Sequence, residues 1–405
     1  MVDKLSSPIS KKSNKTKTGR MVVRYRAGVD RIFLVLVIAL LGLGTIMIFS
    51  ASYVNALEYK EDSFFFSGKQ LRWAALGIVV MLLLSYVPFL DYVTIEKFTI
   101  AFFLVALGLN FATPIVGIIS HGATRWVTIG PIQFQPSELL KIGAIMVFAL
   151  YASKVNEKMK KWTWGLWLPL LLVLLCLAPM LMQKHISGLV IVTLICLAML
   201  FICECKLQLV ITIVAAVSAV VISVCLFPEK VIKFLDGIGF GHAGERIEFW
   251  RDPYKDALNK GLQIIQSLYA IGSGGWTGLG LGQSKQKFLY LPEPHNDYIF
   301  AILCEELGYI GAISVIVLFS LLIWRGFVIA RKAPNKFSSL VAAGITIKVA
   351  LQFWLNIAVV TNLLPATGIS LPFFSYGGTA LVILMGEMGI VLSISRYSYK
   401  ENLES

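Results

Sequence analysis

The stretch FLYLPEPHNDYIFAILCEELGYIGA, residues 288–312, joins a polar segment directly to an apolar one. The polar half holds Glu293, His295 and Asp297 within five positions. The apolar half has the character of a membrane helix, yet it carries Glu305 and Glu306. A charged side chain at the bilayer centre costs about 2.5–3.5 kcal/mol on insertion scales, so such residues indicate pairing or function.

The composition places the whole chain in a membrane. Of its 405 residues, 57% are hydrophobic and only 15% are charged, which excludes an ordinary soluble protein. A membrane helix needs roughly 20 apolar residues. The chain has ten such runs, at residues 32–51, 73–90, 98–118, 138–154, 163–182, 187–204, 207–227, 297–324, 338–361 and 377–395. Because lipid cannot satisfy backbone amides, we expect an all-α polytopic bundle of about ten transmembrane helices.

The distribution of positive charge orients this bundle. The net charge is +13, and the first 31 residues alone hold nine Lys and Arg. The connections 154–162 and 325–337 and the C-terminal segment are also basic, so we expect both chain ends to be cytoplasmic. The expected organisation is a basic disordered cytoplasmic tail (1–28), a ten-helix transmembrane domain (29–396) and a second cytoplasmic tail (397–405). The first tail suits an anionic membrane surface, and no nucleic-acid partner is expected.

The motif-rich connections then fall outside the cytoplasmic membrane. They are 119–137, 183–187, 362–376 and the longest, 228–296, between the seventh and eighth helices. Loops of that length are usually functional. We therefore expect the chemistry to take place at the outer face.

The acidic residues of the opening stretch allow two interpretations each. Asp297 could be a helix-terminal charge favoured by the helix dipole, or a functional carboxylate clustered with Glu293 and His295. Glu305 lies about 12 Å deeper at 1.5 Å per residue. Glu305 and Glu306 could be structural, with Lys141 and Lys348 as candidate partners, or could act in the chemistry directly.

Three further segments carry notable residues. In TRWVTIGPIQFQPSELLK (124–141), Arg125 and Trp126 suit a membrane surface, and Glu138 and Lys141 lie on one helix face. The long loop combines basic residues with recurring glycines, and these do not form a nucleotide-binding motif. The basic residues could bind an anionic head group, or they could be the ordinary charges of a solvated loop. The prolines and glycines of NLLPATGISLPFFSYGGTA (362–380) predict irregular backbone that faces the external cavity.

Three of these motifs together resemble one family of bacterial cell-wall proteins. QPSELLK, LPEPHNDYIFAILCEELGYIG and LPATGISLPFFSYGGTA, in this order and on one membrane side, resemble the shape, elongation, division and sporulation (SEDS) family. The form NLLPATGISLPF is closer to the FtsW and SpoVE branch than to RodA. The resemblance covers almost the whole chain.

The resemblance implies a peptidoglycan glycosyltransferase of the bacterial cytoplasmic membrane, at the division septum or in sporulation. Its substrate would be lipid II, a disaccharide pentapeptide on undecaprenyl diphosphate, and its partners a class B penicillin-binding transpeptidase and other divisome membrane proteins. The essential aspartate falls on Asp297, as general base or as ligand of a divalent cation, Mg²⁺ or Mn²⁺. Implied substrate-binding residues are Arg125, Trp126, Arg246, Gln263, Lys285, Lys287, Glu293 and His295, and the implied charge network is Glu138, Lys141, Glu305 and Glu306.

The chain departs from the family pattern at two places. The Pro-Asp-Leu-Gly sequence of the family is replaced by QKHISG at 183–188, where His185 is a candidate partial stand-in for the aspartate. Leu262 replaces the family's usual aromatic residue before Gln263. Two other functions stay open. A lipid II flippase would use charged residues along a path through the midplane, and a scaffold that only recruits a transpeptidase would tolerate replacement of Asp297.

Overall fold

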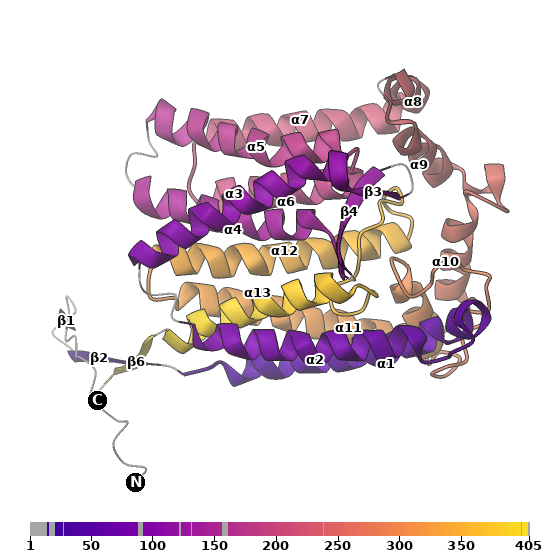
Figure 1. Cartoon of the computed structure of the whole chain (residues 1–405), viewed down its shortest axis with the longest axis horizontal. Helices are drawn as coiled ribbons and strands as arrows, with labels where there is room; N and C mark the ends of the chain where they lie inside the picture. The colour runs from indigo at the N-terminus through magenta and orange to yellow at the C-terminus, as the bar shows by residue number, and fades with distance from the viewer. Residues whose placement is uncertain are drawn as a thin grey trace, which may run out of the picture.

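The computed structural model describes residues 14–15, 21–26, 28–87, 92–120, 123–130, 132–155, 161–237, 239–397 and 399–403. Ten long helices run alongside one another, and each overlaps one of the ten predicted runs (Figure 1). They are α1 (Arg31–Lys60), α2 (Phe65–Tyr86), α3 (Tyr92–Val116), α4 (Pro136–Val155), α5 (Leu168–Met182, preceded by the π-helical turn η2, Thr163–Trp167), α6 (Ile186–Ile202), α7 (Leu207–Leu226), α11 (Ile299–Arg331), α12 (Lys336–Val360) and α13 (Gly378–Tyr397).

The helices have the length and composition of a multi-pass membrane protein. Within the described residues, eight are long and apolar enough to cross a bilayer. The shorter apolar helix α6, of 17 residues, and α4, which carries Glu138 and Lys141, complete the set. The predicted polytopic helical bundle is confirmed.

The segments at the predicted outer end contain more regular structure than the sequence indicated. The loop 228–296 holds α8 (Pro228–Gly237), α9 (Gly241–Arg251), the 3₁₀ turn η3 (Pro253–Asp256) and α10 (Leu262–Ser273), which lie together at one end of the bundle (Figure 1). These helices are short and of mixed polarity, so no long apolar run in the sequence indicates them. Between α3 and α4, strands β3 (Ile118–Ser120), β4 (Ala123–Ile129) and β5 (Ile132–Phe134) pair antiparallel.

A second small sheet lies at the opposite end of the bundle (Figure 1). It consists of β1 (Asn14–Lys15), β2 (Met21–Arg26) and β6 (Tyr399–Leu403), with β2 paired antiparallel to both others. The described parts of the two chain ends thus meet. The tail 1–28 was expected to be disordered, and β1 and β2 lie within it. Apart from residue 28, the rest of this tail lies outside the described part of the chain, and its disorder stays a prediction.

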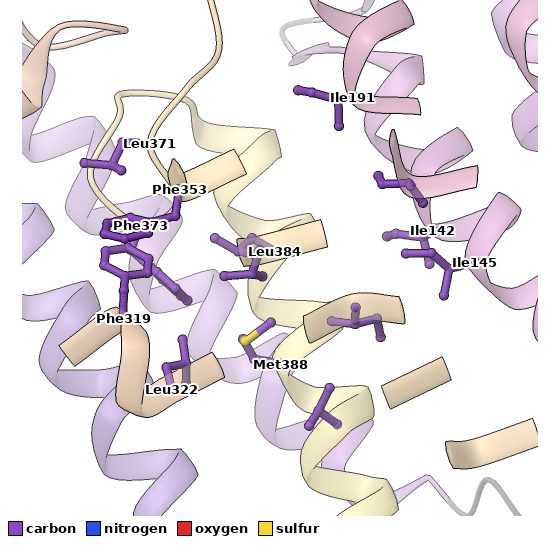
Figure 2. Close-up of a cluster of buried hydrophobic side chains, with 14 of the residues drawn as sticks. Ile142, Ile145, Ile191, Phe319, Leu322, Phe353, Leu371, Phe373, Leu384 and Met388 are labelled. Atoms are coloured by element: carbon purple, nitrogen blue, oxygen red, sulfur yellow. The ribbon is translucent and has the colours of Figure 1, made fainter. Parts of the chain in front are cut away.

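Aromatic packing joins the late helices to the irregular segment 362–377. The rings of Phe319 on α11 and Phe353 on α12 stack with centroids 4.1 Å apart, and Phe373 and Phe374 close the cluster (Figure 2). A side chain at Gly44 of α1 would place its Cβ 2.3 Å from the carbonyl oxygen of Phe373, so only glycine lets α1 approach this segment. The irregular backbone is therefore held inside protein, as its depth requires.

A buried charge cluster links α4, α12 and α13. Lys141 donates to Glu138 at 2.5 Å, and the amine of Lys348 lies 3.4 Å from Glu138 and also bonds Glu387. Lys141 and Lys348 were candidate partners of the carboxylates of α11, but both pair with other carboxylates instead. Glu138 and Glu387 pair with these lysines because α4, α12 and α13 meet at this position in the bundle.

Removal of one charge from this cluster leaves a buried partner unpaired, which costs about 3–5 kcal/mol. We expect Lys348→Met to lower the melting temperature of the detergent-purified protein markedly. Adding Glu387→Leu should restore part of the loss, because it removes the uncompensated carboxylate. The control Lys154→Met removes a half-exposed ion pair with Glu96 and should change little. Equal melting of Lys348→Met and wild type would show that the cluster does not support the fold.

Candidate active site

Asp297 is held immediately before α11 by the side chain of Asn356. The Asn356 amide, fully buried on α12, donates to the carbonyl oxygen of Asp297 at 2.8 Å and to that of Ile369 at 2.7 Å. One amide thus joins the start of α11 to the segment 362–377. Sequence reasoning missed Asn356, because a single Asn in an apolar helix does not reveal its partners.

His295 has a structural position next to Asp297. Its ring packs against Phe66 with centroids 4.5 Å apart and against Tyr376, whose backbone N–H donates to the His295 carbonyl at 2.9 Å. Burial lowers the pKa of His295 to about 4, and the charge of Glu293 opposes this only partly. The imidazole is therefore neutral near pH 7 and shapes the segment that carries Asp297.

Gly368 lies directly against the Asp297 carboxylate. Its φ is +70°, and a Cβ there would stand 3.1 Å from Asp297 Oδ2 and 3.9 Å from Ser187 Oγ. The Ser187 hydroxyl in turn donates to the carbonyl of Thr367. The segment QKHISG therefore places a serine against the Thr367–Gly368 backbone, a position that the sequence did not indicate.

Two arginines from separate elements converge electrostatically on the Asp297 carboxylate. Arg125 comes from β4 and Arg246 from α9, and both are half-buried. Burial lowers the pKa of Arg125, as does the charge of Arg246, while Asp297 raises it. Burial also lowers the pKa of Arg246, again opposed by Asp297. Two guanidinium groups thus share one carboxylate, which leaves this region positively charged and suited to an anion.

Two further side chains border these charges. His185, at the start of α6, has its pKa lowered to about 3 by burial and next by Arg125. Tyr298 is 4% exposed, its hydroxyl lacks a hydrogen-bond partner among the described residues, and burial and then Asp297 raise its pKa. Both groups are neutral near pH 7, so they do not offset the positive charge of the arginines.

The carboxylates of α11 organise the glycine-rich loop. Glu305 accepts from the backbone N–H groups of Lys285 at 3.0 Å and Gln286 at 3.3 Å. Glu306 accepts from Lys287 Nζ at 3.0 Å and from the Ser50 hydroxyl at 2.7 Å. Both carboxylates are fully buried, so their role in this structure is to hold the loop.

A break in α11 lets this loop pack against the helix backbone. Gly308 has φ +67°, and on either side of it the helix and the loop exchange backbone hydrogen bonds. Leu279 N donates to the Glu305 carbonyl at 2.9 Å, and Tyr309 N donates to the Gly275 carbonyl at 2.9 Å. A side chain at Gly278 would meet the Glu306 carbonyl at 2.1 Å, which explains why glycines recur in the loop.

The remaining predicted site residues differ in position. Lys287 is 3% exposed and occupied by Glu306 and Ser50, so it faces the protein instead of a ligand. Lys285 is exposed, and Glu293 is exposed and accepts from Asn296 at 3.0 Å. Trp126 on β4 and Gln263 on α10 are half-buried. The electrostatic contacts of Asp297 described above are with Arg125, Arg246 and Tyr298.

A divalent cation fits this site only with ligands from a substrate. Within the described residues, no group of three or more His, Cys, Asp or Glu side chains is placed to hold a metal ion. Mg²⁺ is often bound by one or two carboxylates together with substrate phosphates. Asp297 fits that pattern as the protein's carboxylate.

The neutral imidazole of His295 makes the protein less stable in acid. The pKa of His295 is about 4 in the folded protein, against an ordinary value of 6.5. Between these values the unfolded chain binds a proton that the folded protein does not, so the stability that is fully present above pH 6.5 is lost as the pH falls towards 4. We expect a loss of roughly 2 kcal/mol from this group at about pH 5. Melting curves should show a larger acid-induced drop for wild type than for His295→Gln, whose amide does not titrate. Equal drops would mean that His295 is not held neutral.

Comparison with known proteins places this fold and site in a family. A family model described as "Cell cycle protein", covering FtsW, RodA and SpoVE, matches residues 31–400. The stage V sporulation protein E of Bacillus subtilis is 38% identical over 91% of this chain and 97% of its own length. A probable peptidoglycan glycosyltransferase FtsW of Geobacter sp. strain M18 is 36% identical over 91% of this chain and 97% of its own.

Solved structures agree with the sequence comparison. One, described as "Structural coordination of polymerization and crosslinking by a peptidoglycan synthase complex", has a chain with TM-score 0.71 and 25% identity, covering 91% of this chain and 98% of that one. The rod shape determining protein RodA of Thermus thermophilus shares the fold with TM-score 0.64 at 24% identity, over 92% of this chain and 98% of its own. With sequence matched over residues 31–400 and the fold matched as well, the chain belongs to the FtsW/RodA/SpoVE family of cell cycle proteins.

Proposed function

We propose that the protein is a peptidoglycan glycosyltransferase that polymerises lipid II on the outer face of the bacterial cytoplasmic membrane. The observation that carries the proposal is one carboxylate, Asp297, whose charge acts on two half-buried guanidinium groups, Arg125 and Arg246. Lipid II offers the matching chemistry, because it has a hydroxyl to deprotonate and a diphosphate leaving group. Relatives in the same family are named peptidoglycan glycosyltransferases.

In the proposed reaction, the 4-hydroxyl of one GlcNAc attacks the anomeric carbon of a MurNAc on a second lipid. The bond between that carbon and the diphosphate oxygen breaks as the new glycosidic bond forms. Asp297 accepts the hydroxyl proton as general base. Arg125 and Arg246 bind the departing undecaprenyl diphosphate and stabilise its developing charge.

The proposal includes a second role for Asp297, as a ligand of a divalent cation, Mg²⁺ or Mn²⁺. Asp297 would hold the cation, which would supply charge neutralisation at the leaving group. The roles of Asn356 and Gly368 are the same with or without it, since both position the Asp297 segment.

The family and the predicted outer position of the site support the proposed setting. The protein would act with a class B penicillin-binding transpeptidase and other membrane proteins of the divisome, at the septum or in sporulation. The FtsW and SpoVE relatives support these two settings.

The decisive test of the function is polymerisation of lipid II by purified protein with its transpeptidase. Asp297→Asn should reduce the rate by about 10²–10⁴, the range for loss of a general base. The matched control Asp252→Asn should keep full activity, because Asp252 is an exposed helix cap and Asn caps equally well. Wild-type-like activity of Asp297→Asn would overturn the assignment.

Chelation separates the two roles of Asp297. If the cation takes part, EDTA should stop polymerisation and added Mg²⁺ or Mn²⁺ should restore it. If activity survives in EDTA while Asp297→Asn is inactive, Asp297 acts as a base alone. If wild type forms no polymer, lipid II translocation into vesicles is the next assay, since it tests the flippase alternative.

The glycine opposite the carboxylate gives a second prediction. Gly368→Ala should lower polymerisation at least tenfold, because φ of +70° disfavours alanine and its methyl group would press on Asp297 Oδ2. The control Gly272→Ala, on α10, adds a methyl group with no heavy atom within 4 Å. Thermal melts of both variants show whether the protein stays folded. Full activity of Gly368→Ala would contradict the close approach described here.

A further inference from the structure

The outer helix α9 delivers Arg246, and its attachment to the bundle is specific. Trp250 Nε1 donates to the carbonyl oxygen of Asn362 at 3.1 Å. In return, the Asn362 side-chain amide donates to the Trp250 carbonyl at 3.4 Å. The two residues are 112 positions apart in the chain, so this reciprocal pair closes a long loop onto the bundle.

The attachment point has a physical reason at the end of α12. The last carbonyls of a helix lack partners within the helix and must find them elsewhere. The hydroxyl of Ser267 on α10 satisfies the Val360 carbonyl at 2.8 Å, and the indole of Trp250 bonds the carbonyl of Asn362, two residues beyond the last residue of α12. Asn362 has φ +57°, a left-handed conformation that Asn tolerates better than most residues.

The geometry of α9 couples this attachment to the site. Arg246 and Trp250 are four residues apart, so they lie on the same face of the helix. The nearly opposite face packs on α8, where Gly244 lies against Ile232. The Trp250–Asn362 pair therefore attaches to the end of α12 the face of α9 that carries Arg246.

We propose that Trp250 and Asn362 form a latch that holds Arg246 within electrostatic reach of the Asp297 carboxylate. Trp250 is a positioning residue in this proposal, and it acts on the substrate's diphosphate through Arg246. The inference rests on the proposed function, because it assigns Arg246 to the diphosphate. When the latch is broken, α9 stays folded on α8 but no longer holds the guanidinium in place.

Two substitutions break the latch one bond at a time. Trp250→Phe keeps an aromatic ring and removes the N–H donor. Asn362→Gly keeps the backbone acceptor and the positive φ, and removes only the side-chain amide. The matched control Trp276→Phe makes the same chemical change at an indole that is 73% exposed.

The first readout is lipid II polymerisation kinetics. We expect Trp250→Phe to raise KM about fivefold, the effect of one lost hydrogen bond, with a smaller effect on kcat. In an Arg246→Gln background the same substitution should change kcat/KM less than twofold, because the group that the latch positions is already gone. An equal loss in both backgrounds would overturn the proposal, as would no loss in either.

The second readout does not depend on activity. Hydrogen–deuterium exchange of the α9 amides should be faster in Trp250→Phe and Asn362→Gly than in wild type, and unchanged in Trp276→Phe. Unchanged exchange in both latch variants would contradict the latch itself. Faster exchange with unchanged kinetics would contradict the positioning of Arg246. Exchange still tests the latch if wild type forms no polymer, so failure of the proposed function is recognised separately.

Discussion

The side-chain amide of Asn356 is the interaction on which the candidate site depends. It satisfies two carbonyls, those of Asp297 and Ile369, at the place where α11 begins and the segment 362–377 passes by. Backbone at membrane depth that is neither helix nor sheet must find partners within the protein. By supplying them from α12, Asn356 brings together two segments that the chain separates by more than seventy residues. The left-handed Gly368 and the packed His295 then refine the position of Asp297.

The charges of the molecule divide into two groups with different tasks. Glu138, Lys141, Lys348 and Glu387 pair inside the bundle, and Glu305 and Glu306 are used up in holding the glycine-rich loop. These groups stabilise geometry. At the outer end the balance is different, because Arg125 and Arg246 share a single carboxylate. That excess of positive charge makes the predicted outer end suitable for a diphosphate. The pairing of the buried charges with one another argues against a charged path through the midplane.

Much of this arrangement could be predicted from the sequence, because long apolar runs and charged residues beside them are strong signals of membrane helices and their functional ends. Ten apolar runs predicted ten helices, and the polar segment before α11 identified Asp297 as a candidate. What escaped prediction depends on contacts between distant residues. Nothing near Lys348 indicates Glu387 as its partner, and Lys285 and Lys287 look alike in sequence although one is exposed and the other is buried against Glu306. Helices α8 to α10 lack a long apolar run, so they were missed.

The most direct measurement of the central claim is binding of a polyprenyl diphosphate, without any reaction, by native mass spectrometry of the detergent-purified protein. Arg125→Gln and Arg246→Gln should each raise the Kd about tenfold, as expected for loss of a charge-assisted hydrogen bond. Arg251→Gln, an exposed arginine on the same helix as Arg246, should bind like wild type. If all three variants bind equally well, the two guanidinium groups beside Asp297 do not form the diphosphate site.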